Sequence, residues 1–317
     1  MNLNQLYFHA RHRIRLNPYA QRAIYTLQNC VFSIFGRLAK RRDDCPEPAH
    51  TSVALCLRFR DEARYLREWL DYYYAAGVSH FFLYNNFSED NYRDVLAPYV
   101  ERGLVTVIEW SFAPASPAAE EDCILRARGQ YKWVGFFDAD EFVVIKDHRS
   151  IPEFLDGYNG YPGVALHWLM FGSSRHVDRP GGPVIEAYAY RGVEPNFHVK
   201  CFVRADAVAQ WRNTHSWYFR GMSRAVNELR RSVTGTLSVP VTAEMAWINH
   251  YHSKSEEDYR EKMARRPQQD DVTMRFPNRR PEFLAKAMSE WNDIYDSSAV
   301  EYYRARIAIR AAGCATR

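Results

Sequence analysis

The sequence of 317 residues lacks a long hydrophobic run. No stretch of 18 or more apolar residues occurs, so we expect no transmembrane helix. A short apolar core followed by a small-residue cleavage site is also missing, which argues against a secretory signal peptide. With 47% hydrophobic and 25% charged residues, the composition is that of an ordinary globular protein large enough to bury a core.

Regular cysteine spacing is missing too. The six cysteines form no CxxC pair and no repeating framework, which predicts reduced thiols in the cytoplasm and excludes a zinc-spaced Cys/His set. The chain also lacks a Walker loop, a GxGxxG motif and a Ser-His-Asp arrangement. ATP hydrolysis, dinucleotide chemistry and serine-type proteolysis are therefore poor hypotheses.

Acidic residues are absent from positions 1–42, which hold eight basic ones: Arg11, Arg13, Arg15, Arg22, Arg37, Lys40, Arg41 and Arg42. The other 34 basic residues face 38 acidic ones, so the body offers no general nucleic-acid footprint. Apolar residues after Pro18 recur at helical spacing, which predicts an amphipathic helix. That helix either contacts an anionic membrane peripherally at its inner face or packs on its own domain. Residues 43–50 predict a linker.

Strand-like and helix-like segments alternate from residue 51 onward. The apolar pattern predicts strands at 52–57, 80–84, 104–110 and 133–137, with helices at 61–76, 91–101 and 119–130 between them. Repeated βα units indicate an α/β fold with a mostly parallel central sheet and flanking helices. Beyond residue 151 we expect strands at 163–171, 184–190 and 197–203, and a mostly helical tail from residue 256.

The stretch from Lys132 to Val144 is read as one buried strand that runs into an acidic turn. Asp138, Asp140 and Glu141 follow the apolar residues directly. Side chains two apart in an extended chain point the same way, so Asp138 and Asp140 can converge on one hard cation. Such a pair at the carboxyl end of a strand lies where open α/β sheets bind ligands. The alternative is a capping turn with solvated carboxylates.

Several separate motifs occur in a fixed order between Val53 and Lys262. They are Arg60-Asp-Glu62, Leu66-x-Glu-Trp69, Gly77-Val78, Phe82-x-Tyr84-Asn-Asn, Ser88-x-Asp90, Trp133-x-x-Phe-Phe-Asp-Ala-Asp-Glu-Phe142, Phe171-Gly-Ser-Ser174 and His250-Tyr-x-Ser-Lys-Ser255. In this order they resemble glycosyltransferase family 92 and related family 2-like glycosyltransferases. The order of the motifs is more specific than any one of them.

The resemblance implies a GT-A-like α/β domain at 51–262, between the N-terminal arm and linker at 1–50 and a helical extension at 263–317. It implies an inverting glycosyltransferase that takes a sugar from a nucleotide-sugar donor. Together with the basic amphipathic arm, it leads us to expect that a hexose is moved to a glycan or lipid-linked saccharide, in surface polysaccharide synthesis on the cytoplasmic side of a membrane. It also implies Mn²⁺ or Mg²⁺ as cofactor. The expected metal ligands are Asp138, Asp140 and His250, with His252 as the alternative to His250.

The resemblance also implies a set of donor-binding residues: Arg60, Asp61, Glu62, Asn85, Asp122, Arg126, Asp138 and Ala139. The sequence has Asp61 where the family usually has Asn, and Asn85 where Asp is usual. Asp61 as a helix N-cap with Glu62 in the first turn is the structural alternative. For Asp122 and Arg126, the alternative is an i, i+4 surface pair.

On the acceptor side, we expect the cleft wall to be formed by Trp168, Ser173, His176, His215 and Trp217. An inverting transfer needs a base for the attacking hydroxyl. Glu186 is the first candidate, and Asp178, Glu194 and His176 compete with it. Lys200, Arg204 and His215 either neutralise a phosphate or are plain surface charge. The alternative functions are a nucleotidyltransferase, against which the lack of glycine in Arg58–Glu62 argues, and a catalytically inactive glycan-binding protein.

Overall fold

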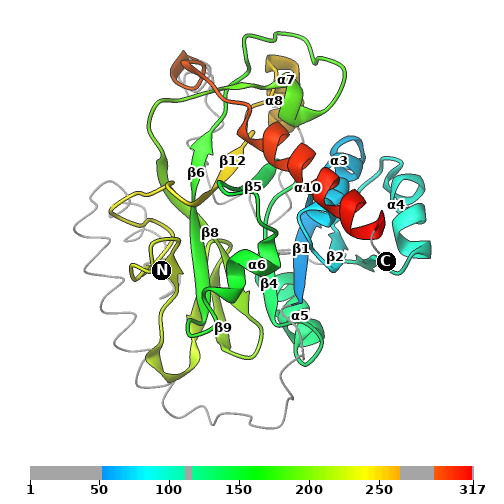
Figure 1. Cartoon of the computed structure of the whole chain (residues 1–317). Coiled ribbons are helices and arrows are strands. Elements are labelled where there is room, and N and C mark those ends of the chain that lie inside the picture. Colours follow the sequence, from blue (N-terminus) through cyan, green and yellow to red (C-terminus); the bar gives the residue numbers. More distant parts are fainter. Residues whose placement is uncertain (1–51, 111–115, 265–288, 316–317) are drawn as a thin grey trace, which may run out of the picture.

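The structure is a computed structural model that describes residues 52–110, 116–264 and 289–315 (Figure 1). The predicted amphipathic helix and linker at 1–50 lie outside these ranges. Among the described residues, no helix is both long and apolar enough to cross a bilayer.

The first half of the domain alternates strands and helices as predicted. Its elements are β1 (Val53–Phe59), α3 (Ala63–Ala75), β2 (His80–Asn85), α4 (Tyr92–Glu101), β3 (Val105–Glu109), α5 (Ser116–Ala127) and β4 (Trp133–Phe136). The four predicted strands and three predicted helices are confirmed, with α5 beginning and ending three residues earlier than expected.

The second half differs more from the prediction. Its elements are β5 (Glu141–Ile145), α6 (Ile151–Asp156), β6 (Gly163–Met170), α7 (Val184–Ala187), β7 (Tyr190–Arg191), β8 (Asn196–Arg204), β9 (Val208–Asn213), β10 (Ser216–Phe219), η1 (Arg220–Met222), β11 (Val226–Asn227), β12 (Ala246–His250), α8 (Glu256–Ala264), β13 (Ile294–Tyr295) and α10 (Ser298–Ala315). The strand predicted at 184–190 is wrong. The Glu68 carboxylate accepts hydrogen bonds from the first backbone N–H groups of this segment, at Val184 (2.7 Å) and Ile185 (3.0 Å), and so holds a helix N-terminus there.

Within the described ranges, the main sheet has nine strands in the order β3-β2-β1-β4-β8-β6-β12-β5, with β11 beside β6. The pairs β3-β2, β2-β1, β1-β4, β6-β12 and β6-β11 are parallel, whereas β8 is antiparallel to both β4 and β6, and β5 is antiparallel to β12. The predicted GT-A-like α/β class, with a mostly parallel sheet and flanking helices, is confirmed.

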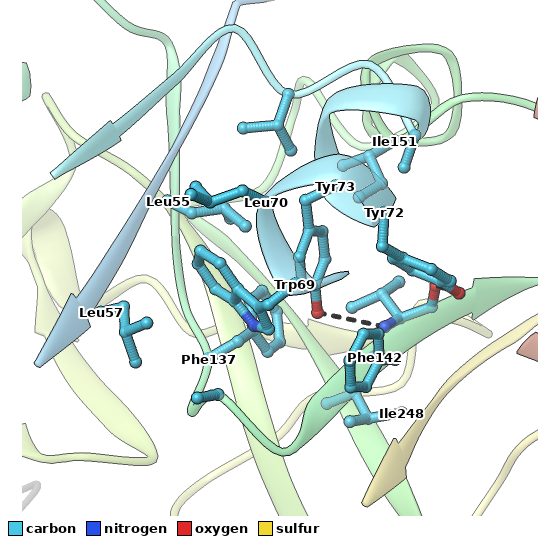
Figure 2. Close-up of a cluster of buried hydrophobic side chains, with 14 of the residues drawn as sticks. Leu55, Leu57, Trp69, Leu70, Tyr72, Tyr73, Phe137, Phe142, Ile151 and Ile248 are labelled. Atoms are coloured by element: carbon cyan, nitrogen blue, oxygen red, sulfur yellow. Dashed lines mark hydrogen bonds between the residues drawn. The ribbon is translucent and has the colours of Figure 1, made fainter. Parts of the chain in front are cut away.

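Both faces of the parallel half are buried, which explains its nearly continuous apolar strands. In β1, Leu55 and Leu57 face a core shared with α3 and α4, while Ala54 and Cys56 face a second core that includes α5. Figure 2 shows the first core, where Trp69 of α3 lies near Leu55 and Phe137.

The C-terminal helix belongs to the first core. Tyr302 of α10 is fully buried, packs against Tyr72 of α3, and donates a hydrogen bond to the Arg149 carbonyl oxygen (3.1 Å). Arg306 donates to the Ala75 carbonyl oxygen at the end of α3. Figure 1 shows α10 crossing beside β5 and α3. The last helix therefore buries apolar surface of the domain that carries the acidic residues.

Candidate functional site

The acidic residues 138–141, called the acidic turn below, follow the carboxyl end of β4. Strands β1, β2 and β4 are parallel, so their carboxyl ends lie at the same edge of the sheet. The chain passes from β1 to β2 on one side, and β4 pairs with β1 on the other. This reversal of strand order is a topological switch point, where open α/β sheets bind ligands.

The shape of the acidic turn is fixed from the inside by α3. Trp69 Nε1 donates to the Asp138 carbonyl oxygen (3.1 Å), and the Tyr73 hydroxyl donates to that of Glu141 (2.9 Å). The Tyr73 hydroxyl also accepts from the Val143 N–H (3.1 Å), as Figure 2 shows. Residues 139 and 140 form a turn, so the two aspartates do not follow the strand alternation that we expected of an extended chain.

Each aspartate of the turn is paired with a lysine from a distant element. Lys200 Nζ of β8 lies 2.8 Å from Asp138 Oδ2 and 3.4 Å from Glu141 Oε2. Lys262 Nζ of α8 lies 2.9 Å from Asp140 Oδ2. The Asp138 side chain is 58% exposed, whereas that of Lys200 is only 3% exposed. The turn thus presents a carboxylate to solvent above a buried ammonium.

The charge states in the turn follow from burial and from these lysines. Burial disfavours the ionised carboxylates, but Lys200 holds the pKa of Asp138 below its usual value, and Lys262 and Lys254 hold that of Asp140 well below it. Burial raises the pKa of Glu141 well above its ordinary value, and Lys200 offsets this only in part. The two aspartates are therefore ionised at neutral pH, whereas burial opposes ionisation of Glu141.

His250, at the end of β12, meets the second aspartate. Its Nε2 lies 3.5 Å from Asp140 Oδ1, and burial lowers the pKa of its ring, so the imidazole is neutral at pH 7. Two buried polar atoms, His250 Nδ1 and Glu141 Oε1, have no hydrogen-bond partner in the described part of the chain. Across the same part of the chain, no group of three or more His, Cys, Asp or Glu side chains is arranged to hold a metal. The structure thus brings Asp140 and His250 into contact at the acidic turn.

A polar cavity of about 130 Å³ opens beside Asp138. It is lined by Cys56, Arg58, Glu120, Phe136, Phe137, Asp138, Lys200 and Thr214. Glu120 of α5 is buried there and accepts a hydrogen bond from Trp211 Nε1 (2.5 Å). Burial raises the pKa of Glu120 to about 7, against the opposing effect of Lys200. This cavity lies between the ends of β1 and β4, at the switch point.

The predicted donor residues of the first two turns are engaged in local structure. Asp61 Oδ1 accepts from the Glu89 N–H (2.7 Å), and the Asn85 amide donates to Glu109 Oε2 (2.6 Å). Asp61 does not cap α3; that role falls to Asp90, whose Oδ2 accepts from the Ala63 N–H (2.8 Å). Arg60 lies next to Asp61 (Nε to Oδ2, 3.7 Å). The half-buried Glu62 precedes α3 directly.

The other predicted donor residues lie on α5 and in the turn itself. Asp122 accepts from Arg126 Nε (2.6 Å), the i, i+4 pair that we considered as the alternative, and also from the Tyr84 hydroxyl (2.8 Å). Ala139 is buried between the two aspartates of the turn. The structure thus places Asp138 at the cavity edge and engages Asp122 with β2.

The predicted acceptor residues fall into two groups. Trp168 of β6 lies against His250 (ring centroids 4.3 Å apart) and against His215 (5.3 Å), so both stand beside the acidic turn. Burial lowers the pKa of His215 to about 3, so its ring is neutral and supplies no charge to a phosphate. Trp217 packs on Phe136 in the core.

The second acceptor group lies toward α7 and α8. His176 Nε2 bonds the Ala187 carbonyl oxygen (3.1 Å), and Ser173 Oγ accepts from the Arg175 N–H (3.1 Å). Glu186 is 49% exposed and pairs with Arg304 of α10 (3.1 Å). None of the contacts found in residues 52–110, 116–264 and 289–315 joins Glu186 to the acidic turn. The competing candidates Asp178 and Glu194 are exposed.

Arg204 and Lys200, both considered as phosphate partners, lie at different positions along β8. Because β8 is antiparallel to β4, Arg204 lies beside Trp133, at the start of β4, and pairs with Asp206. It therefore stands at the edge of the sheet opposite the acidic turn, which favours the surface-charge alternative over a phosphate contact. Lys200 lies at the turn itself.

Sequence reasoning missed Glu120, Lys254 and Lys262. Lys254 belongs to the His250–Ser255 motif, from which only the histidines were predicted to take part in the site. Lys262 sits one helix further on, and Glu120 precedes the singled-out Asp122 by two residues. Glu120 and Lys254 are buried charged side chains, and Lys262 meets the turn only through tertiary packing; a sequence displays neither property.

Comparison with known proteins places the fold in a family. A family model described as glycosyltransferase family 92 matches residues 52–281. A glycosyltransferase family 92 protein of Oryza sativa subsp. japonica is 30% identical over 223 residues, covering 68% of this chain and 35% of that protein. A galactan beta-1,4-galactosyltransferase of Arabidopsis thaliana is 28% identical over 127 residues, covering 37% of this chain and 24% of that protein.

The chain thus spans about a third of the length of the rice relative. Among solved structures, S. aureus TarS 1-349 superposes with a TM-score of 0.38 at 10% identity, covering 81% of this chain and 70% of that one. The match of the family model to most of the sequence, including the acidic turn and the His250–Ser255 motif, shows that this chain belongs to glycosyltransferase family 92.

Proposed function

We propose that this chain is a glycosyltransferase that moves a hexose from a nucleotide-sugar donor to a glycan or lipid-linked saccharide in surface polysaccharide synthesis. The observation that carries the proposal is the pair of ionised aspartates at the switch point, surrounded by ammonium groups and one neutral imidazole. A nucleoside diphosphate leaves with extra negative charge, so a site of this kind stabilises its departure electrostatically.

The residues present fit a divalent cation shared with the donor. Mg²⁺ commonly takes one or two carboxylates and completes its shell with substrate phosphates and water, so a closed protein cage is not required. Asp140 and His250 would hold Mn²⁺ or Mg²⁺, with Asp138 nearby. When bound, the ion would draw electron density from the departing diphosphate. Lys262 and Lys254 keep Asp140 ionised and available as a ligand.

We propose further that the transfer inverts the anomeric carbon, which requires a base for the acceptor hydroxyl. Glu186 stays our prediction for that base, and Trp168, Ser173, His176 and His215 stay predictions for the acceptor wall. Trp168 and His215 have the stronger support, because their rings stand beside His250 and the acidic turn. Since relatives include galactan beta-1,4-galactosyltransferases, an activated galactose is the first donor to test.

Purified full-length protein incubated with a panel of sugar nucleotides and Mn²⁺ tests the proposal. We expect Asp138→Asn and Asp140→Asn to lower turnover roughly hundredfold or more, because each removes charge that acts on the departing diphosphate. Asp206→Asn is the matched control, since Asp206 also pairs with a cation, at the opposite edge of the sheet.

Each alternative function has its own result in the same assay. Wild-type turnover by a folded Asp140→Asn variant would contradict the proposal. Glycan binding without donor turnover would identify a glycan-binding protein instead. Release of pyrophosphate from a nucleoside triphosphate would identify a nucleotidyltransferase.

A further inference from the structure

Three lysines reach the acidic turn from three separate elements. Lys200 comes from β8, Lys254 from the loop after β12, and Lys262 from α8. Their side chains are 3%, 6% and 32% exposed, respectively. Burying an ammonium is costly unless it is paired, so three of them beside one turn need an explanation.

Neutralising the turn does not require all three. Asp138 is hydrogen bonded by Lys200 and Asp140 by Lys262, so each aspartate already has an ammonium partner. Lys254 is the additional one: its Nζ reaches Asp140 Oδ2 only at 3.9 Å, which is beyond hydrogen-bond distance. Structural pairing accounts for two of the lysines and leaves the third.

Local geometry keeps Lys254 at this position. Its backbone has a φ of 52°, in the left-handed region that residues other than glycine rarely adopt. Its ammonium rests 4.4 Å from the centre of the Tyr65 ring. The nearby Asp258 carboxylate is already engaged by Tyr65, Tyr188 and Ser255. Residues in such conformations cluster at ligand-binding and active sites, where the surrounding structure holds them in place.

We propose that Lys200, Lys254 and Lys262 form a cluster that binds the diphosphate of the donor directly, so that part of nucleotide binding does not depend on a metal ion. The proposal rests on the proposed function and adds residues to its donor site. Two aspartates alone would repel an incoming diphosphate. The three ammonium groups offset the charge of the two aspartates, and Lys254 offers donors to phosphate oxygens without giving up a hydrogen-bonded carboxylate.

Isothermal titration of the full chain with UDP and with GDP, in Mn²⁺ and again in EDTA, tests this inference. We expect wild-type protein to keep measurable affinity for at least one of them in EDTA. Lys254→Met and Lys262→Met should each weaken that residual binding roughly tenfold or more, because each removes a charge-assisted contact to phosphate. The same substitutions should weaken binding of the corresponding nucleoside monophosphate less than binding of the diphosphate, since the monophosphate presents fewer phosphate oxygens to the cluster.

Controls separate this inference from the wider function. Lys146→Met removes an exposed lysine at the end of β5 and should change nothing. Lys254→Arg should restore part of the affinity, and a thermal melt of each variant reports its fold. Residual binding that both methionine variants leave unchanged, or wild-type binding that EDTA abolishes, overturns the lysine cluster alone. A folded wild-type chain that binds neither nucleotide in Mn²⁺ or EDTA overturns the donor site itself, and the cluster with it.

Discussion

At the scale of single residues, Glu120 links the cavity to stability. Its pKa in the folded state is about 7, against 4.5 for an ordinary glutamate. Between these values the folded protein holds a proton that the unfolded chain releases, so wild-type stability falls as pH rises through this window and levels off above about pH 7. We expect Glu120→Gln to remove this loss, which amounts to about 3 kcal/mol.

Urea unfolding at about pH 5 and about pH 8 measures that effect. The variant should gain stability relative to wild type as pH rises, and Glu101→Gln at the exposed end of α4 is the control. Parallel pH profiles for Glu120→Gln and wild type would show that the carboxyl is not buried as described.

Tyr73 is the second residue with a measurable role, because one hydroxyl serves two buried backbone groups. Tyr73→Phe leaves the Val143 N–H and the Glu141 carbonyl oxygen without this partner. We expect a loss of about 2 to 4 kcal/mol in the free energy of unfolding, since each buried unsatisfied group costs about 1 to 3 kcal/mol. Tyr303→Phe on α10, whose ring stacks on Tyr72, should cost much less. Equal losses for the two variants would contradict the role given to the hydroxyl.

The sequence identified the aspartates of the site and one of its cations, Lys200, but not Lys254 and Lys262. Asp138 and Asp140 were predictable because three carboxylates directly after a buried strand have few structural uses. Lys200, Lys254 and Lys262 come from positions 60 or more residues further along the chain, and only the packing of β8, β12 and α8 brings them together. Glu186 illustrates the converse: its position after a family motif made it a candidate, yet its described partner is Arg304.

At the scale of elements, α10 acts as part of the domain core. Tyr302→Ala should lower the free energy of unfolding by about 3 to 5 kcal/mol, because a large buried ring leaves a cavity. Ile307→Ala, on the exposed side of the same helix, should stay within about 0.5 kcal/mol of wild type. Urea denaturation measures both. A small effect of Tyr302→Ala would mean that α10 is only loosely attached.

The βα half of the fold was predictable because both faces of its strands are buried and its helices end at glycines such as Gly77 and Gly103. The other half was less so. The strand at 133–137 and the acidic turn after it were predicted, but the strand that follows the turn was not: β5 joins the far edge of the sheet beside β12, a pairing that the local sequence does not reveal. The helix at 184–187 depends on Glu68, which a local pattern does not reveal.

At the scale of the whole molecule, charge is divided between the N-terminal arm and the body. We propose that the eight basic residues of positions 1–42 favour the first of the two expected roles of the arm, a peripheral contact with the inner face of an anionic membrane. Replacing Lys40, Arg41 and Arg42 by Gln should weaken binding to anionic phosphatidylglycerol vesicles roughly hundredfold, at about 1 kcal/mol per basic residue. Added salt should weaken wild-type binding as well.

Vesicle cosedimentation measures these affinities, with phosphatidylcholine vesicles as the neutral control. Equal binding to neutral and anionic vesicles would contradict an electrostatic contact. Absence of binding to either would favour packing of the arm on its own domain.

Trp69 and Tyr73 give the acidic turn its form from within the molecule. Grafting residues 138–141 onto another scaffold would transfer the carboxylates without the α3 side chains whose hydrogen bonds fix the backbone of the turn. The transplantable unit is the loop together with α3, and substitutions in one should be compensated in the other as relatives diverge.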